Sequence, residues 1–138
     1  MIEVQNIIKS FDGIEVIKEI SSVFEKGKTN LIIGQSGSGK TVFLKCLLGL
    51  FEADSGKILF EGKGLGKMSV KERSILRQEM GMVFQGSALF DSMTVEENIM
   101  FPMQMFTQKD DHEIRERANL VIKRVNLIKA NSKYPDEI

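Results

Sequence analysis

The sequence contains no tryptophan, one cysteine, one histidine and only two prolines. A single cysteine cannot form a disulfide within the chain, so we expect Cys46 to be a small buried apolar residue in a reducing compartment. No apolar run approaches the roughly 20 residues that a membrane span requires. The N-terminal stretch MIEVQNIIKSFDG lacks the basic, apolar and cleavage regions of a secretory signal. Together these absences predict a cytosolic protein.

An excess of charge of one sign is also missing, because 19 Lys and Arg residues balance 19 Asp and Glu residues. Bulk charge therefore gives no reason to expect nucleic acid or an anionic membrane surface as a partner. The length of 138 residues and the hydrophobic content of 42% are those of one ordinary globular domain.

The hydrophobic patterns predict an α/β fold with an antiparallel β portion at the front. The stretches IEVQNIIKSF and IEVIKEISSVF are rich in β-branched residues and flank Asp12-Gly13, a dipeptide suited to a tight turn. TNLII, KILFEG and GMVF are three further expected strands.

Helices are expected where apolar residues recur every three or four positions. Apolar residues after Lys40 predict one helix, and Gly49 marks its exit. Two capping boxes predict helices that begin after Ser69 and after Thr94. Asp111 is the expected cap of the last helix, whose apolar stripe comprises Ile114, Ala118, Val121, Ile122, Val125 and Ile128.

The segment GQSGSGKT, residues 34–41, has the pattern G-x-x-x-x-G-K-[ST] of a phosphate-binding loop. Gly34, Gly37 and Gly39 permit backbone conformations in which successive N–H groups face an anion. Lys40 is expected to reach the β- and γ-phosphates of a nucleotide, and the Thr41 hydroxyl to take one magnesium position. The alternative is a flexible Gly/Ser loop that binds nothing. The motif alone does not choose among kinases, GTPases, motor ATPases and transporter ATPases, although no guanine-specific N-K-x-D segment is present.

A second segment, MGMVFQGSALFDSMTVEEN, narrows the choice. It resembles the ATP-binding cassette (ABC) ATPases, in which a short strand ends in a Phe-Gln pair, here Phe84 and Gln85. The order of KSFDG, the phosphate loop, DSGKILFEG and this segment is also similar to that family. Within the family, FQGSALFDSMTVEENI with its later FP looks most like ATPases of lipid-transporting complexes of the maintenance-of-lipid-asymmetry type.

The resemblance implies ATP and Mg²⁺ as cofactors and assigns roles to particular residues. Phe11 matches the aromatic residue that stacks on adenine, with a packed strand residue as the alternative. Lys40 and Gln85 are the implied catalytic residues, and Thr41 and Gln85 the implied metal-site residues. The implied cofactor-binding set is Phe11, Gly34, Ser36, Gly37, Ser38, Gly39, Lys40, Thr41 and Val42.

The resemblance also implies partners and a location. Residues 86–106 match the region that docks on a transmembrane permease subunit, and a second ATPase subunit would complete a dimer. The expected location is therefore the cytoplasm, peripheral to the cytoplasmic face of the cell membrane. Nucleic acid is not an expected partner. The implied domain is a partial nucleotide-binding domain over 1–138, in which 1–85 form the β portion and P-loop core and 86–138 begin the helical subdomain.

Several motifs of that family have no counterpart in these 138 residues: the signature loop, the Walker B strand with its glutamate, and the switch histidine. Asp91 and the Asp136-Glu137 pair are poor matches to Walker B, and His112 is expected to be a solvated first-turn residue. We therefore expect a truncated ABC core, an ATP-binding subunit of a transporter that binds ATP but hydrolyses it negligibly by itself.

Two other classes stay open from the sequence. A stand-alone P-loop phosphotransferase would use Asp91 with Lys71, Arg73 and Arg77 as an acceptor site. A noncatalytic nucleotide-binding module would bind nucleotide without turnover and dock on a partner.

Overall fold

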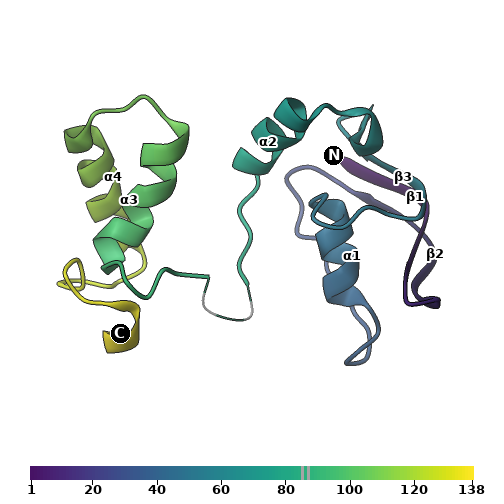
Figure 1. Cartoon of the computed structure of the whole chain (residues 1–138), viewed down its shortest axis with the longest axis horizontal. Helices are drawn as coiled ribbons and strands as arrows, with labels where there is room; N and C mark the ends of the chain where they lie inside the picture. The colour runs from purple at the N-terminus through teal and green to yellow at the C-terminus, as the bar shows by residue number, and fades with distance from the viewer. Residues whose placement is uncertain (85, 87) are drawn as a thin grey trace. The chain divides into compact units, whose positions relative to one another are not determined.

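The computed structural model describes residues 1–84, 86 and 88–138. The chain forms two compact units, Met1–Met82 and Val83–Ile138 (Figure 1). Each unit has its own hydrophobic clusters, and each is described by itself below.

The first unit is built on a four-stranded sheet in the order β2-β1-β3-β4, and every neighbouring pair is antiparallel. A tight turn at Asp12 and Gly13, with φ of 50° and 79°, joins the first two strands, and two positive φ angles are what such a hairpin turn requires. The predicted antiparallel β portion is thus confirmed. The strands are β1 (Ile2–Phe11), β2 (Ile14–Phe24), β3 (Ser55–Phe60) and β4 (Lys63–Gly64).

Helix α1 (Lys40–Leu47) and the sheet together form the hydrophobic core of this unit. Phe43 and Cys46 of the helix are buried together with Val4, Ile7 and Ile17 of the sheet. Cys46 is fully buried, and burial raises the pKa of its thiol. The expectation that this cysteine acts as a small apolar core residue is therefore confirmed.

Two of the predicted strands, TNLII and GMVF, do not form. Residues 29–33 and 81–84 have no strand assignment, and Leu31, Ile33 and Val83 are 80%, 85% and 96% exposed. A strand needs a neighbour that exchanges backbone N–H and C=O bonds with it. The described strands pair only among themselves, so β-branched composition alone does not make these segments strands.

The first unit ends with a short 3₁₀ turn, η1 (Leu65–Lys67), and helix α2 (Val70–Gln78). The predicted capping box opens α2: the Ser69 hydroxyl accepts a bond from the Glu72 backbone N–H, and the Glu72 carboxylate accepts one from the Ser69 N–H. No residue of α2 is buried.

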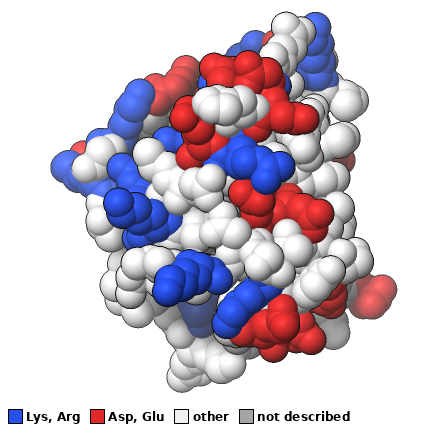
Figure 2. Space-filling view, turned by 90° about the vertical axis from the view of Figure 1, so that its left-hand side faces the viewer, with Lys and Arg blue, Asp and Glu red and all other residues white. Residues whose placement is uncertain are grey.

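The second unit is a helical hairpin of α3 (Val95–Phe106) and α4 (Asp111–Arg124), followed by a 3₁₀ turn, η2 (Pro135–Glu137). The predicted capping box at Thr94 and Glu97 is present. Figure 2 shows Lys and Arg side chains interspersed with Asp and Glu on the side that bears these two helices. A partner that binds here would therefore meet charges of both signs.

Two details predicted for the last helix are wrong. Asp110, not Asp111, caps α4 by accepting a bond from the backbone N–H of Glu113. The apolar stripe is also shorter than expected, because α4 ends at Arg124 and the side chains of Val125 and Ile128 are 58% and 66% exposed. In the described part of the chain, none of the helices combines the length and apolar character that crossing a bilayer demands.

Candidate phosphate-binding site

The loop of residues 34–39 leads directly into α1, and its glycines are used for their conformations. Gly37 and Gly39 have φ of 79° and 89°, and Gly39 is the N-cap of the helix. A β-carbon on Gly39 would lie 2.9 Å from the carbonyl oxygen of Val16 in β2. A side chain at this position would therefore push the loop away from the sheet, which explains the need for glycine both by space and by φ.

Lys40 closes the loop. Its Nζ donates hydrogen bonds to the carbonyl oxygens of Gly34 and Gln35, at 2.8 and 2.7 Å. The loop is tight enough that a β-carbon on Gly34 would lie 2.7 Å from Ser38 Oγ. The sequence therefore folds here into a ring of backbone around one ammonium group, at the N-terminal end of a helix.

The other members of the predicted set lie on or beside this ring. Ser36, Gly37 and Ser38 are exposed, as is Thr41 in the first turn of α1. Val42 is different, because its side chain packs against the hydrophobic core. The structure thus leaves polar loop atoms accessible and uses Val42 to anchor the helix.

This arrangement fits an anionic ligand. The first N–H groups of a helix have no intrahelical partner and attract negative charge, and the first turn of α1 carries no acidic side chain that would compete. The described residues include no group of three or more His, Cys, Asp and Glu side chains placed to hold a metal. Thr41, exposed in the first turn of α1, offers a hydroxyl oxygen of the kind that Mg²⁺ takes as a ligand.

Phe11 lies at the end of the same hairpin that contacts the loop. It pairs with Ile14, two residues before the Val16 that approaches Gly39. Its ring is 39% exposed and meets the Phe51 ring edge-on, with centroids 5.4 Å apart. The Nζ atom of Lys9 also lies over this ring, 5.3 Å from its centre. The Phe11 ring therefore has two contacts within the protein, and part of it stays accessible. Gln85, the second implied catalytic residue beside Lys40, lies outside the described residues.

Two of the three basic residues of the phosphotransferase alternative, Arg73 and Arg77, have other partners. Arg73 Nη1 lies 2.9 Å from Glu52 Oε1, and Arg77 Nη2 donates to the carbonyl oxygen of Gly49 at 2.8 Å. Asp91 lies in a turn and not at the end of a strand. His112 is 80% exposed in the first turn of α4, beside Glu116. None of these contacts assembles an acceptor site.

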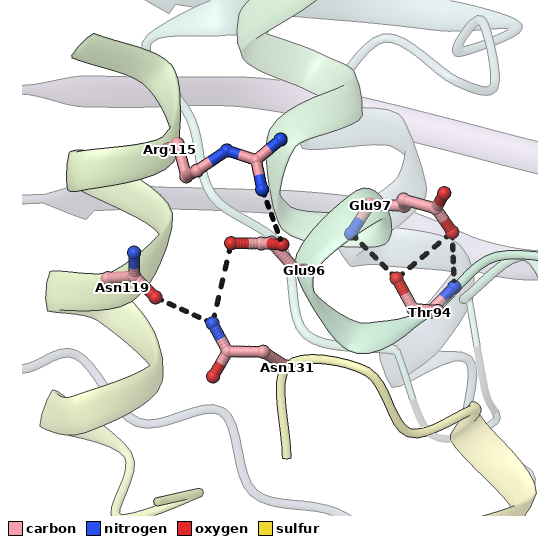
Figure 3. Close-up of polar contacts among 6 residues, drawn as sticks. All are labelled: Thr94, Glu96, Glu97, Arg115, Asn119 and Asn131. Atoms are coloured by element: carbon pink, nitrogen blue, oxygen red, sulfur yellow. Dashed lines mark hydrogen bonds and ion pairs between the residues drawn. The ribbon is translucent and has the colours of Figure 1, made fainter. Parts of the chain in front are cut away.

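The segment expected to dock on a permease contains a polar network at the start of α3 (Figure 3). Glu96 Oε2 lies 3.3 Å from Arg115 Nη1, and Glu96 Oε1 accepts a hydrogen bond from Asn131. Asn131 also donates to Asn119 Oδ1 at 2.6 Å. Glu97 is occupied by the capping box with Thr94. Glu96 therefore links α3 to α4 and to the segment after it, whereas Glu97 stabilises the start of its own helix.

Sequence reasoning missed the structural roles of Arg77 and Asn131. Arg77 binds the end of α1, and the Asn131 backbone carbonyl accepts a bond from the Glu96 N–H at 3.1 Å. Arg77 is distant in sequence from the end of α1, and Asn131 is distant from Glu96. A local spacing pattern therefore cannot predict either contact.

Comparison with known proteins places these features in a family. The ABC transporter family model matches residues 17–137. A probable ribonucleotide transport ATP-binding protein, mkl, of Mycobacterium leprae is 36% identical over 137 residues, which are 99% of this chain and 40% of that protein. The methionine import ATP-binding protein MetN 1 of Listeria innocua is 35% identical over 143 residues, which cover 100% of this chain and 42% of that protein.

A solved structure shows the same fold. The dimeric structure of MJ0796, a bacterial ABC transporter cassette, matches with a TM-score of 0.90 and 25% identity over 100% of this chain and 63% of that one. The chain thus spans about two fifths of the length of the curated relatives it matches. With a family model that covers residues 17–137, the chain belongs to the ABC transporter family, as an α/β ATP-binding cassette sequence.

Proposed function

We propose that the chain is the ATP-binding part of an ABC transporter ATPase that binds Mg²⁺-ATP at residues 34–41. The observation that carries the proposal is the backbone ring around Lys40 at the N-terminus of α1, in a chain of this family. Lys40, Thr41 and backbone N–H groups of the loop would hold the triphosphate and its metal ion, and Phe11 the base. The bound nucleotide supplies the phosphoanhydride bond whose hydrolysis drives transport.

The domain proposal follows the family. Residues 1–85 would form the β portion and P-loop core, and residues 86–138 the start of the helical subdomain. Gln85 is proposed, from the Phe-Gln pattern, to approach the metal ion and the attacking water.

The proposed partners are a transmembrane permease subunit, bound through 86–106 at the cytoplasmic face of the membrane, and a second ATPase subunit. Support for the second subunit comes from the MJ0796 cassette, whose solved structure is a dimer. Lipid is the proposed cargo, and it rests on the segment FQGSALFDSMTVEENI alone. The relatives named above carry the names of ribonucleotide and methionine transporters. A transport assay with phospholipid, ribonucleotide and methionine in membranes that contain the permease separates these cargoes.

The 138 residues by themselves are proposed to bind ATP without appreciable hydrolysis. Phosphoryl transfer needs charge stabilisation and a positioned water at the reacting phosphate, and this sequence holds no signature loop, Walker B strand or switch histidine. Loss of general-base help alone costs about 10²- to 10⁴-fold in rate.

The test is titration of the chain with Mg²⁺-ATP in a calorimeter, followed by a phosphate-release assay on the same sample. Saturable binding with turnover at the buffer background supports the proposal. Absence of binding contradicts the nucleotide site. Robust turnover contradicts the proposal that hydrolysis needs the signature loop, the Walker B strand and the switch histidine. Transfer of phosphate to a small acceptor would instead favour the phosphotransferase.

A further inference from the structure

Helix α2 is attached to the far end of the phosphate-loop helix by an arginine. Arg77 Nη2 donates to the carbonyl oxygen of Gly49 at 2.8 Å, and Arg77 Nε donates to that of Leu48 at 3.3 Å. Leu48 is the C-cap of α1, and Gly49 follows it. One guanidinium group therefore binds both residues at which the helix ends.

These carbonyls suit a cation. The last carbonyl groups of a helix have no intrahelical partner and form the negative end of its dipole. The backbone there is also held in place, because the N–H groups of Gly49 and Leu50 donate to the carbonyl oxygens of Cys46 and Lys45 at 3.0 and 2.9 Å. Arg77 thus contacts a well-defined part of α1.

The rest of α2 is attached loosely. No residue of the helix is buried, and Val70 and Ile75 are 87% and 50% exposed. Leu76 packs partly against the core. Two ion pairs at the surface add to this contact: Arg73 with Glu52, whose side chain is 79% exposed, and Glu72 with Lys63 of β4. Elements with few buried contacts open locally at low free-energy cost, and exposed ion pairs contribute little to stability. The two hydrogen bonds of Arg77 to the end of α1 are therefore a substantial part of what keeps α2 docked.

We propose that Arg77 is a positioning residue that passes the nucleotide state of the phosphate loop to α2, the last helix before the chain enters its second unit at Val83. The proposal rests on the proposed ATP site at the other end of α1. A bound nucleotide orders the loop and with it α1. The carbonyl groups of Leu48 and Gly49 then stay in place for the guanidinium, and the docked state of α2 becomes more populated.

Linkage makes the effect reciprocal, because a docked α2 raises the affinity for the nucleotide by the same factor as the nucleotide favours docking. Loss of the Arg77 contact should therefore weaken ATP binding by about fivefold, the lower end of the range typical of coupling between two sites, while the phosphate contacts themselves remain.

Hydrogen exchange with and without saturating Mg²⁺-ATP tests this on the whole chain. In the unchanged protein, ATP should slow exchange of the backbone amides of residues 70–80. In Arg77→Gln, ATP should still bind and the slowing at 70–80 should be lost. Arg77→Lys should give a partial effect, because an ammonium group cannot reproduce the two bonds of the guanidinium fork. Lys71→Gln, on the exposed surface of the same helix, is the matched control and should behave as the unchanged protein.

The outcomes separate this inference from the proposed function. If the unchanged chain binds no ATP, the proposed function fails. If it binds ATP without slowing exchange at 70–80, or if Arg77→Gln keeps the slowing, the role of Arg77 is refuted and the ATP site stands. Should Arg77→Gln fail to fold, Arg77→Lys settles the matter, because slowing as large as in the unchanged protein would overturn the inference.

Discussion

The Nζ atom of Lys40 lies 2.8 Å from the carbonyl oxygen of Gly34, so the ammonium group is already at the centre of the loop that a phosphate would enter. A triphosphate oxygen offers it a full negative charge in place of carbonyl dipoles.

Lys40→Ala should therefore weaken ATP binding strongly. A hydrogen bond to a charged group contributes about 1.5–3 kcal/mol, which corresponds to a roughly 10- to 150-fold rise in Kd. Calorimetric titration measures this directly. Lys45→Ala is the control, because Lys45 lies on the same helix with its Nζ 5.1 Å from the centre of the Phe51 ring. Equal affinities of the Lys40→Ala and unchanged proteins would contradict the proposed site.

Phe11→Ala should weaken binding of ATP and leave binding of inorganic triphosphate unchanged. Stacking of a base on an aromatic ring is worth about 1–3 kcal/mol, and Phe11 is 39% exposed at the end of the hairpin. Phe11→Leu keeps apolar volume without the ring, and Phe11→Tyr keeps the ring. A parallel loss of triphosphate affinity in Phe11→Ala would show that Phe11 only supports the hairpin beside Gly39.

The attachment of α2 should weaken in acid because of Glu72. Its hydrogen bonds to Lys63 and to the Ser69 backbone and hydroxyl lower its pKa from 4.5 to about 2. A carboxyl group with a lowered folded-state pKa stabilises the fold above its unfolded pKa, and this stability is lost as pH falls toward the folded value. The loss should thus extend from about pH 4.5 to about pH 2.

An NMR titration of the Ser69 amide over that range measures the effect. In Glu72→Gln the titration of this amide should disappear, because glutamine carries no charge to lose. Glu79, an exposed glutamate at the end of α2, provides the control, since Glu79→Gln should leave the titration in place. A midpoint near pH 4.5 in the unchanged protein would show that the bonds of Glu72 do not favour its charged form in solution.

Permease docking through 86–106 is best tested on side chains that have no structural role. Charge reversal at Glu96 or Glu97 would also remove contacts within the second unit, since Glu96 pairs with Arg115 and Glu97 completes a capping box. Met105 and Phe106, at the end of α3, are 61% and 59% exposed.

Met105→Asp and Phe106→Asp should therefore reduce the fraction of the protein that sediments with host membranes, while ATP affinity stays the same. Leu120→Asp, at an exposed position of α4 outside the segment, should have no effect. Unchanged membrane recovery in both α3 variants, with circular dichroism confirming their folding, would argue against docking at this end of the segment.

Local sequence was enough to predict the elements whose cause is local. The turn at Asp12-Gly13, the glycine-lysine loop and the capping boxes at Ser69 and Thr94 each follow from residues at most seven positions apart. Their hydrogen bonds close within the segment itself, so the sequence pattern determines the geometry.

Tertiary structure decided everything that requires a distant partner. TNLII and GMVF have the composition of strands, yet they form none, because no described neighbour exchanges backbone bonds with them. Arg77 and Asn131 look like ordinary surface residues in the sequence, but one binds the end of α1 and the other the start of α3. The sequence by itself determined a phosphate loop and its helix. The contacts that connect this helix to the rest of the first unit exist only once the chain has folded, because their partners are distant in sequence, as Phe43 is from Phe24 and Arg77 is from Gly49.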